Sequence, residues 1–526
     1  MDVLIVGAGF GGLYMLHRAR CMGLETTVLE AADGVGGTWY WNRYPGARCD
    51  IESLEYSFGF DEALQQEWRW TERFAAQPEI LAYANHVADR FGLRPHIRLG
   101  TRVVSATFDE AAARWRVTTD NGETLEARFL VMATGCLSSA NLPDIAGRDS
   151  FAGRTFHTGR WPHEAVDFTG RRVGVIGTGS SAVQSIPLIA GQAKELVVFQ
   201  RTATYSVPAR NAPLDPAEDA EVKANYAELR RRNRQMLNAF GARTPRRDIA
   251  CASASAQERE RAFEERWQLG GLFYLGAFND LMLDAGANAA AAEFVRRKIR
   301  AVVQNPETAM LLTPTQPIGC KRLFIDTGYY ETSTRPNVQL VDVTDTPIQR
   351  ITAKGVIAGG REFVLEDLVF ATGFDAMTGA LAKIDIRGKG GVSLAERWAA
   401  GPRNYLGLAV VGFPNLFMIT GPGSPSVLTN MMVSIEQHVE WISACLAAMA
   451  KAGHARIEAR PEAEDAWVAH VNAVADRTLF PGCNSWYLGA NVPGKPRVFM
   501  PLVGFPAYEQ KCAEVAAQGY EGFALQ

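Results

Sequence analysis

Two glycine-rich segments, each directly after a short apolar run, constrain the fold of this 526-residue chain more than any other feature. The first, Gly7-Ala-Gly9-Phe-Gly-Gly12, follows residues 3–6, and the second, Gly177-Thr-Gly179-Ser-Ser-Ala182, follows residues 173–176. A strand, a turn of this spacing and a helix open a Rossmann unit, in which the glycines allow a tight turn and close approach of the backbone to a pyrophosphate. The sequence therefore predicts an α/β protein with two Rossmann-like dinucleotide-binding domains.

The two units differ in the residues that end their second strand. Residues 27–29 run into Glu30, whereas residues 196–199 run, at the same offset from their glycine segment, into Gln200, Arg201 and Thr202. A carboxylate at this place accepts hydrogen bonds from free ribose hydroxyls, while an arginine with a threonine suits a 2′-phosphate. We therefore expect FAD at the first site and NADPH at the second, with a hydride passing from NADPH to the flavin.

The composition of the chain indicates which partners and which cellular location to expect. The chain carries 54 Lys and Arg against 57 Asp and Glu, a net charge of −3, and its basic residues are dispersed, so nucleic acid is not an expected partner. No apolar stretch approaches the roughly 20 residues of a membrane span, and the first residues lack the cationic start of a signal peptide. We expect a cytoplasmic enzyme with no membrane partner; a monomer is compatible with the sequence, which leaves the oligomeric state open.

The cysteines and histidines argue against two other classes of protein. The eight cysteines show neither CxxC nor metal-ligand spacing, and the eight histidines include no HExxH, so we expect neither a metal site nor a disulfide framework. Flavin disulfide reductases use two cysteines close together beside the flavin, but Cys49 has no near neighbour in the sequence. The electrons must therefore leave the flavin by another route.

A repeated strand ending indicates that each dinucleotide domain is discontinuous. The predicted strand over residues 129–132 ends on Ala133-Thr-Gly135, and the one over 368–370 ends on Ala371-Thr-Gly373, which suggests that the chain crosses between domains at both places. Residues 226–237, 258–269 and 289–303 have helical spacing. We assign residues 1–136 and 374–526 to the FAD domain, 137–207 and 319–373 to the NADPH domain, and 208–318 to a helical insertion in the NADPH domain. Further strands are expected over residues 97–104, 105–108 and 115–119.

Two aromatic, glycine-rich strings carry a family resemblance. Residues 36–50 read GGTWYWNRYPGARCD and match G-G-x-W-x-x-x-x-Y-P-G-x-x-x-D. The segment before the second Rossmann strand matches F-x-G-x-x-x-H-x-x-x-W-P at Phe151, Gly153, His157, Trp161 and Pro162. The chain resembles the Baeyer–Villiger monooxygenases, and residues 421–430, which have the longer form of a family loop, resemble the phenylacetone monooxygenase branch.

The resemblance implies an NADPH- and O2-dependent flavoprotein monooxygenase that converts ketones to esters or lactones. It would act through a C4a-peroxyflavin anion and a Criegee-type intermediate, with sulfoxidation as a side activity. Two alternatives stay open. A flavin monooxygenase acting on nitrogen or sulfur would share most of the scaffold but uses the protonated hydroperoxide, and a non-catalytic NADPH or flavin sensor would share both nucleotide sites.

The chemistry indicates Arg322 and Asp50 as catalytic residues. A peroxide anion in a dry pocket needs a fixed positive partner, and arginine keeps its charge where lysine or histidine loses it. Asp50 would hold the guanidinium by a charge-assisted hydrogen bond. In an extended segment Lys321 points to the opposite face from Arg322, where it could reach the 2′-phosphate. For His157, between the two domains, the resemblance implies a conformational role.

We expect two sets of cofactor contacts from the motifs and the resemblance. The FAD set is Gly7, Gly9, Gly12, Glu30, Gly37, Thr38, Trp39, Asp50, Tyr56, Val103 and Met431. The NADP set is Arg48, Cys49, Gly177, Thr178, Gly179, Ser180, Ser181, Ala182, Arg201, Thr202, Lys321, Arg322 and Trp486. The resemblance further implies that the indole nitrogen of Trp486 donates to the nicotinamide ribose.

Overall fold

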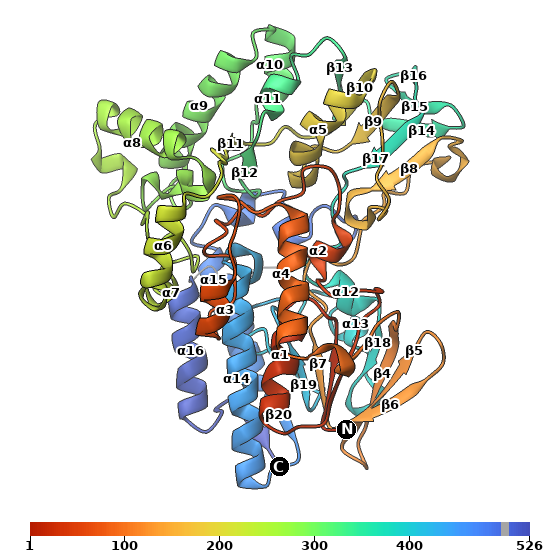
Figure 1. Ribbon diagram of the computed structural model, residues 1–526, viewed down its shortest axis with the longest axis vertical. Coiled ribbons are helices and arrows are strands. Elements are labelled where there is room, and N and C mark those ends of the chain that lie inside the picture. Colours follow the sequence, from red (N-terminus) through yellow and green to blue (C-terminus); the bar gives the residue numbers. More distant parts are fainter. Residues whose placement is uncertain (496–503) are drawn as a thin grey trace.

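Two parallel sheets dominate the computed structural model, which describes residues 1–495 and 504–526. One lies in the lower half and one in the upper half of the molecule (Figure 1). The lower sheet has the strand order β19-β7-β1-β2-β3, and the upper sheet has the order β13-β10-β9-β17-β8. All neighbouring strands within each of these two sheets are parallel. The predicted α/β class with two Rossmann-like sheets is confirmed.

The lower sheet is built from short apolar strands, and both of its faces are covered. Because strand residues alternate between faces, Val3 and Ile5 pack against helices α1 and α14, while Leu4 and Val6 pack against a second, four-stranded sheet. The elements of the lower sheet and its helices are β1 (Val3–Val6), β2 (Thr26–Leu29), β3 (Ile97–Arg98), β7 (Phe129–Met132), β19 (Leu416–Met418), α1 (Phe10–Cys21) and α14 (Met431–Ala452). The four-stranded sheet consists of β4 (Val103–Asp109), β5 (Arg114–Thr119), β6 (Thr124–Ala127) and β18 (Asp385–Arg387).

One strand is shorter than the sequence predicts. The strand expected over residues 97–104 ends at Arg98, because Gly100 has a φ of +59° and leaves the extended conformation. The amide of Gly100 donates to the carbonyl of Ala32 at 2.7 Å, and the amide of Thr101 donates to the carbonyl of Glu30 at 2.8 Å. The chain therefore turns toward the end of β2 before β4 begins.

The upper sheet repeats the arrangement of the lower one. β9 (Arg172–Ile176) lies between β10 (Glu195–Gln200) and β17 (Asp367–Phe370), as β1 lies between β2 and β7. Helix α5 (Ser180–Gln192) begins directly after the second glycine turn, as α1 does after the first. The outer strands are β8 (Arg154–His157) and β13 (Val338–Asp342), and a small antiparallel sheet covers one face with β14 (Ile348–Thr352), β15 (Gly355–Ala358) and β16 (Arg361–Val364).

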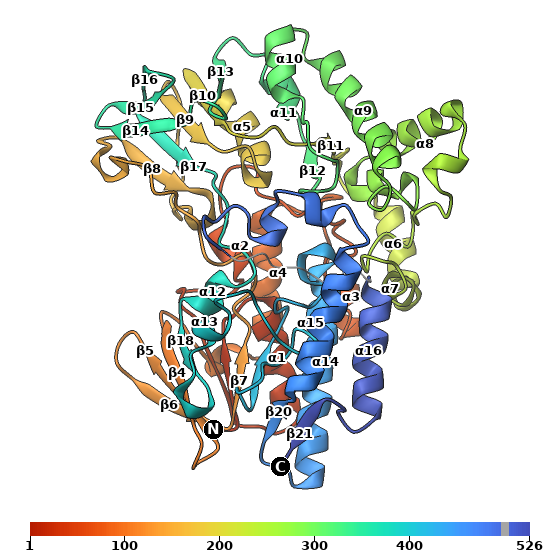
Figure 2. The ribbon, with the colours of Figure 1, turned by 180° about the vertical axis from the view of Figure 1, so that it is seen from behind.

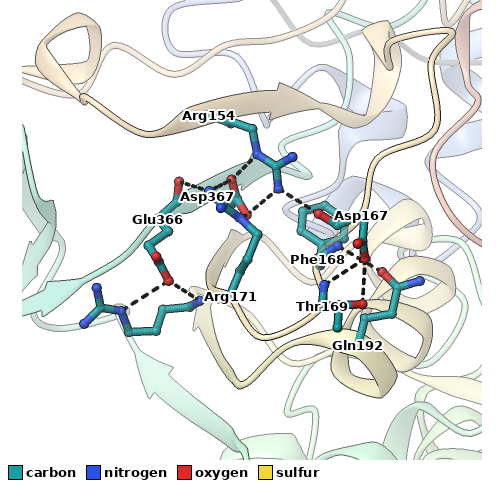
Figure 3. A network of polar contacts seen from close by, with 9 residues as sticks. Arg154, Asp167, Phe168, Thr169, Arg171, Gln192, Glu366 and Asp367 are labelled. Carbon is teal, nitrogen blue, oxygen red and sulfur yellow. Dashed lines mark hydrogen bonds and ion pairs between the residues drawn. The ribbon is translucent and has the colours of Figure 1, made fainter.

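A buried carboxylate fastens β8, the strand of the signature segment, to the upper sheet (Figure 3). Asp367, whose side chain is fully buried, accepts hydrogen bonds from Arg154 at 2.6 and 2.8 Å and also pairs with Arg171. Burial alone would raise the pKa of Asp367, but the two arginines lower it below its usual value. Because β8 also pairs with β17, the signature segment is part of the upper half.

The helices expected between residues 208 and 318 are present and contact both halves. Tyr226 and Leu229 of α7 belong to the lower hydrophobic core, whereas Phe263 of α8 and Phe294 of α9 belong to the upper core. This region lies at the upper left of Figure 1, in yellow-green to green. Its helices are α6 (Pro216–Ala224), α7 (Tyr226–Arg234), α8 (Ala256–Leu269), α9 (Ala285–Val302) and α10 (Pro306–Leu312), and β11 (Ser206–Pro208) pairs with β12 (Phe324–Asp326) where the chain enters and leaves it.

The chain after α15 (Pro461–Ala475) runs along the boundary between the two halves (Figure 2). It forms two short 3-10 helices, η8 (Phe480–Gly482) and η9 (Trp486–Leu488), and α16 (Phe505–Ala517) then packs beside α14. The other helices are α2 (Thr38–Trp41), α3 (Glu62–Glu67), α4 (Gln77–Arg90), α11 (Tyr329–Thr332), α12 (Gly379–Ala382) and α13 (Leu394–Arg397), and the last pair of strands is β20 (Ile457–Ala459) with β21 (Phe523–Leu525). Within the described residues, no helix has both the length and the apolarity that crossing a membrane requires.

Candidate active site

Both glycine turns face one cavity of about 1220 Å³ between the lower and upper halves. All predicted FAD contacts except Gly12 line this cavity, as do all predicted NADP contacts except Ala182. Ala182 is fully buried in the upper core, and Gly12 packs against its own turn. The cavity therefore brings together residues that lie far apart in the sequence, from Gly7 to Trp486.

The first turn is a cradle of bare backbone that fits a pyrophosphate. Gly7 has a φ of +106°, and a Cβ there would lie 2.5 Å from the carbonyl oxygen of Ala133. A Cβ on Gly12 would lie 1.8 Å from the carbonyl oxygen of Gly7, and one on Gly37 would lie 2.9 Å from the Cα of Gly9. Gly9 precedes α1 with no side-chain cap, so the amides of the first helical turn remain available to an anion.

Glu30 ends β2 at the edge of this cradle. Its carboxylate accepts hydrogen bonds from the amide of Ala8 at 2.6 Å and from the amide of Ala32 at 2.8 Å. The side chain is buried, and this burial raises the pKa of Glu30, although the two amides act in the opposite direction. Each carboxylate oxygen can accept a second hydrogen bond, so the residue fits the ribose hydroxyls of FAD.

The second turn has the same backbone geometry. Gly177 has a φ of +109°, and a Cβ there would lie 2.5 Å from the carbonyl oxygen of Ala371. A Cβ on Gly179 would meet no atom within 4 Å, and the residue precedes α5 without a side-chain cap. The hydroxyl of Thr178 donates to the carbonyl of Thr202 at 2.8 Å, which ties the turn to the end of β10. This turn also fits a pyrophosphate.

Two cations lie beside the second turn without a carboxylate partner among the described residues. Lys321 and Arg201 both line the cavity, and neither forms an ion pair within residues 1–495 or 504–526. Burial lowers the pKa of Lys321, and the positive charge of Arg201 lowers it further. Two repelling cations on one cavity wall fit a dianion such as a 2′-phosphate. Arg48, the third predicted cation, already pairs with Glu72 at 2.8 Å.

Arg322 and Asp50 form the ion pair that the sequence predicts. The Nε and Nη2 atoms of Arg322 donate to the two carboxylate oxygens of Asp50 at 2.6 and 2.7 Å, and Nη1 donates to the carbonyl of Val427 at 2.8 Å. Burial works against the charge of Arg322, but Asp50 and the hydroxyl of Tyr487 outweigh it and raise the pKa. Arg322 therefore stays charged in a site whose wall it forms.

The predicted aromatic residues gather on the same cavity. The indole nitrogen of Trp39 donates to the hydroxyl of Tyr56 at 3.1 Å, and Trp486 lines the cavity from η9. Met431 begins α14, but the side chain of Asn430 already accepts the hydrogen bond of the Met432 amide at 3.1 Å. The start of α14 is therefore capped by its own chain.

His157 of the signature segment contacts both places where the chain passes between the halves, one near Asn141 and one near Thr372. The Nε2 atom of His157 lies 3.3 Å from the carbonyl oxygen of Asn141 and 3.3 Å from the hydroxyl of Thr372, and Thr372 donates to Asn141 at 2.6 Å. Burial lowers the pKa of His157 below its usual value. None of the five signature residues lines the cavity, although Gly159 and Arg160 from the same segment do. His157 therefore lies between the two connections and does not face the cavity.

The sequence did not indicate every residue in or beside the cavity, and Tyr487, Asn491 and Asn141 are three examples. Tyr487 contacts Arg322 directly behind Trp486, and Asn491 lines the cavity while its side chain donates to the carbonyl of Phe374 at 2.8 Å. Asn141, which the second connection also contacts, lines the cavity as well.

The cysteine pattern was misleading in one respect. Cys320 and Cys483, with Cα atoms 5.5 Å apart and a sequence separation of 163, form one disulfide that the expectation of no disulfide framework did not foresee. Spacing along the sequence cannot reveal a pair that only tertiary structure brings together. No cluster of three His, Cys, Asp or Glu side chains suited to a metal occurs in the part of the chain that the structure describes.

Two dinucleotide turns on one cavity, with a carboxylate at one and cations at the other, define a flavoprotein oxidoreductase that uses a nicotinamide coenzyme. Residues 4–236 match the family described as pyridine nucleotide-disulphide oxidoreductase. The chain is 45% identical to a Baeyer-Villiger monooxygenase of Pseudooceanicola batsensis over 99% of this chain and 95% of that protein. It is also 43% identical to phenazine N-monooxygenase PhzNO1 of Lysobacter antibioticus, over 100% and 97%.

A solved structure described as an OTEMO complex with FAD and NADP superposes with a TM-score of 0.97 at 40% identity, over 100% of this chain and 99% of that one. The chain belongs to the Baeyer–Villiger monooxygenase family. It is an oxidoreductase that uses FAD and NADP(H) as cofactors, as the sequence predicts.

Proposed function

We propose that the protein converts ketones to esters or lactones. In the overall reaction a ketone, O2, NADPH and one proton give an ester, NADP⁺ and water, so one oxygen atom enters the product and the other leaves as water. The observation that carries the proposal is the Arg322–Asp50 pair on the wall of a cavity that both dinucleotide turns share. When bound, NADPH supplies the hydride and the reduced flavin supplies the activated oxygen.

Arg322 provides the fixed positive charge that this chemistry requires. A guanidinium carries five N–H donors; Asp50 takes two and Val427 takes one, and the hydroxyl of Tyr487 lies close enough to stabilise the charge. At least one donor is left for an oxygen that gains negative charge in the cavity. Because three partners hold the group in place before the reaction, no reorganisation is needed when the charge develops.

The other site residues position the cofactors in this proposal. Glu30 would accept hydrogen bonds from the FAD ribose, while Arg201 and Lys321 would bind the 2′-phosphate of NADPH. Trp486 would hold the nicotinamide ribose, and Met431 would contribute to the flavin site. The cytoplasm, which supplies NADPH and O2, is the setting that the proposal assumes. Sulfoxidation of thioethers belongs to it as a side activity, and the long loop over residues 421–430 supports the phenylacetone monooxygenase branch.

Oxidation of nitrogen is the second candidate, because one relative of similar identity is named a phenazine N-monooxygenase. The buried cation favours ketone oxidation, since it stabilises an anionic nucleophile rather than a protonated electrophile. A panel of ketones, thioethers and aromatic N-heterocycles, with NADPH consumption and products measured in parallel, distinguishes the two. Ester formation from ketones supports the proposal, N-oxides as the only products contradict it, and NADPH use that no substrate stimulates points to a sensor.

Replacing Arg322 tests the role on which the proposal rests. Arg322→Ala should still be reduced by NADPH without oxygen, because hydride transfer does not need the cation. In air it should release hydrogen peroxide and form ester about 100- to 1000-fold more slowly, the effect of removing one charge-stabilising donor. Asp50→Ala should act in the same direction but less strongly. An Arg322→Ala enzyme that makes ester at the wild-type rate would overturn the assignment.

A further inference from the structure

The disulfide joins two segments that build the active site from opposite sides. Cys320 directly precedes Lys321 and Arg322, and Cys483 begins the segment that leads to Trp486 and Tyr487. Both cysteines are buried, at 1% and 4% exposure, in a cluster that also contains Val427 and Tyr487. The disulfide therefore connects the segment that contains Arg322 to the segment that contains Trp486.

The segment from residue 476 to residue 495, which contains Cys483, has little regular secondary structure to hold it in place. Between α15 and residue 495 its regular structure consists of η8 and η9. The amide of Leu479 donates to the carbonyl of Met282 at 3.0 Å, and at the far end Asn491 donates to Phe374 at 2.8 Å. Lys495 also pairs with Asp375, and Phe480 and Tyr487 are buried. With only two short 3-10 helices, however, the segment lacks the hydrogen-bond ladders that make helices and strands costly to open. A covalent bond at Cys483 removes that freedom at the point closest to Trp486.

The surroundings of the pair suit both the oxidised and the reduced state. The Cα separation of 5.5 Å lies in the usual range for a disulfide, so the bond forms without backbone movement. In the reduced state the thiol of Cys483 has an acceptor ready, because its sulfur lies 3.1 Å from the carbonyl oxygen of Leu479. Lys321 and Asn484, the chain neighbours of the two cysteines, line the cavity, so a small oxidant formed there is close to both sulfurs.

We propose that Cys320 and Cys483 form a reversible dithiol–disulfide site that fixes residues 480–488 against the Lys321–Arg322 segment and thereby retains NADP⁺ in the cavity. The proposal depends on the proposed function in one respect only, the binding of NADP⁺ in this cavity. In the oxidising step an S–S bond forms and the O–O bond of hydrogen peroxide breaks. The two thiol hydrogens leave with the two oxygens as water. A small dithiol reverses the step by exchange, and its own sulfurs become oxidised.

Hydrogen peroxide is the product that a flavin monooxygenase releases when oxygen fails to reach a substrate. Uncoupled turnover would therefore oxidise the pair from inside the cavity. The crosslinked enzyme would then hold its coenzyme longer, which favours transfer of oxygen to a substrate over release of peroxide. In a reducing compartment such disulfides are transient and regulatory rather than structural.

The test compares the wild-type holoenzyme after treatment with hydrogen peroxide and after treatment with dithiothreitol. Alkylation followed by peptide mass analysis should show Cys320 and Cys483 blocked in the first sample and alkylated in the second. NADP⁺ should dissociate about tenfold more slowly from the oxidised sample, since retention acts on the dissociation rate. This readout needs no ketone turnover, so it stands apart from the test of the proposed function.

Three variants sharpen the comparison. Cys320→Ser and Cys483→Ser should each release NADP⁺ at the rate of the reduced wild type and should not respond to either reagent. Cys21→Ser, which removes the one exposed free thiol of the described residues, should behave as the wild type. Two results would overturn the proposal: both cysteines remain open to alkylation after peroxide, or the disulfide forms and the NADP⁺ release rate is unchanged. Should a serine variant fail to fold, the wild-type pair of samples still decides the question.

Discussion

The two dinucleotide turns share one backbone design and differ in electrostatics. Gly7 and Gly177 have φ values of +106° and +109°, and a Cβ on either would lie 2.5 Å from a carbonyl oxygen, that of Ala133 or Ala371. Each of those alanines follows the strand beside its own Rossmann strand, with Val6 paired to Met132 and Ile176 paired to Phe370. The similarity between the two units therefore includes the pairing of their strands as well as the glycine turns.

What differs is the residue at the end of the second strand. The first unit places a buried carboxylate there, Glu30, whereas the second places Arg201, with Lys321 from a later segment close by. The comparison teaches that backbone geometry makes a dinucleotide site, while charge at the ribose end selects the dinucleotide. The two properties are separable by substitution.

The largest effect should come from adding one methyl group to either turn. Alanine at Gly7 or Gly177 meets both a positive φ and a carbonyl at 2.5 Å, a strain on the order of 3 kcal/mol or more. Gly7→Ala should purify without FAD, whereas Gly177→Ala should stay yellow but no longer be reduced by NADPH. Absorbance spectra and anaerobic reduction measure both. Gly179→Ala, which meets no protein atom, controls for strain; equal FAD loss in both turn variants would contradict the division of labour.

A smaller effect should follow from removing charge at the second site. Arg201→Ala should raise the KM for NADPH by about 10- to 150-fold, the loss expected for hydrogen bonds to a charged group, about 1.5–3 kcal/mol. The KM for NADH should change little, because NADH has no 2′-phosphate. Arg361→Ala, an exposed arginine of the same half outside the cavity, is the matched control. A parallel change for both coenzymes would refute the assignment.

The smallest effect should appear at Glu30. Glu30→Ala should bind FAD roughly tenfold more weakly, because about 1.5 kcal/mol of hydrogen bonding to the charged carboxylate is lost, the low end of the range used for Arg201, and added FAD should restore activity. Burial raises the pKa of Glu30, so acidification protonates it at a higher pH than an exposed glutamate. FAD retention in the wild type should therefore fall toward acidic pH, and the variant should lose that dependence. Glu25→Ala, with a side chain 79% exposed, is the control, and unchanged FAD occupancy in Glu30→Ala would remove Glu30 from the site.

Local patterns predicted the parts of the molecule that local physics determines. The glycine turns and their strands follow from spacing and apolar runs, and the Arg322–Asp50 pair follows from the charge that the chemistry requires. The family motifs and the glycine turns together located one part of the cavity wall.

Long-range packing accounts for what the sequence did not reveal. Cys320 and Cys483 are 163 residues apart, and Tyr487 reaches Arg322 only because η9 lies on the boundary between the halves. Gly12 and Ala182 fit their motifs, yet both serve close packing of helix against strand instead of lining the cavity. The motif thus identifies a turn, and only the fold shows which of its residues face the ligand.

The ion pair of Asp50 and Arg322 forms only when two separate parts of the molecule are in place. Asp50 comes from the lower half and Arg322 from the segment that leads into the upper half, and both bonds between them are shorter than 2.8 Å. A shift of the two halves by a few ångströms breaks both bonds at once, and the guanidinium then loses the partner that orients it. In the proposed reaction, the charge of Arg322 is correctly placed only when the two halves are in register, so the ion pair makes the placement of that charge depend on how the halves are arranged.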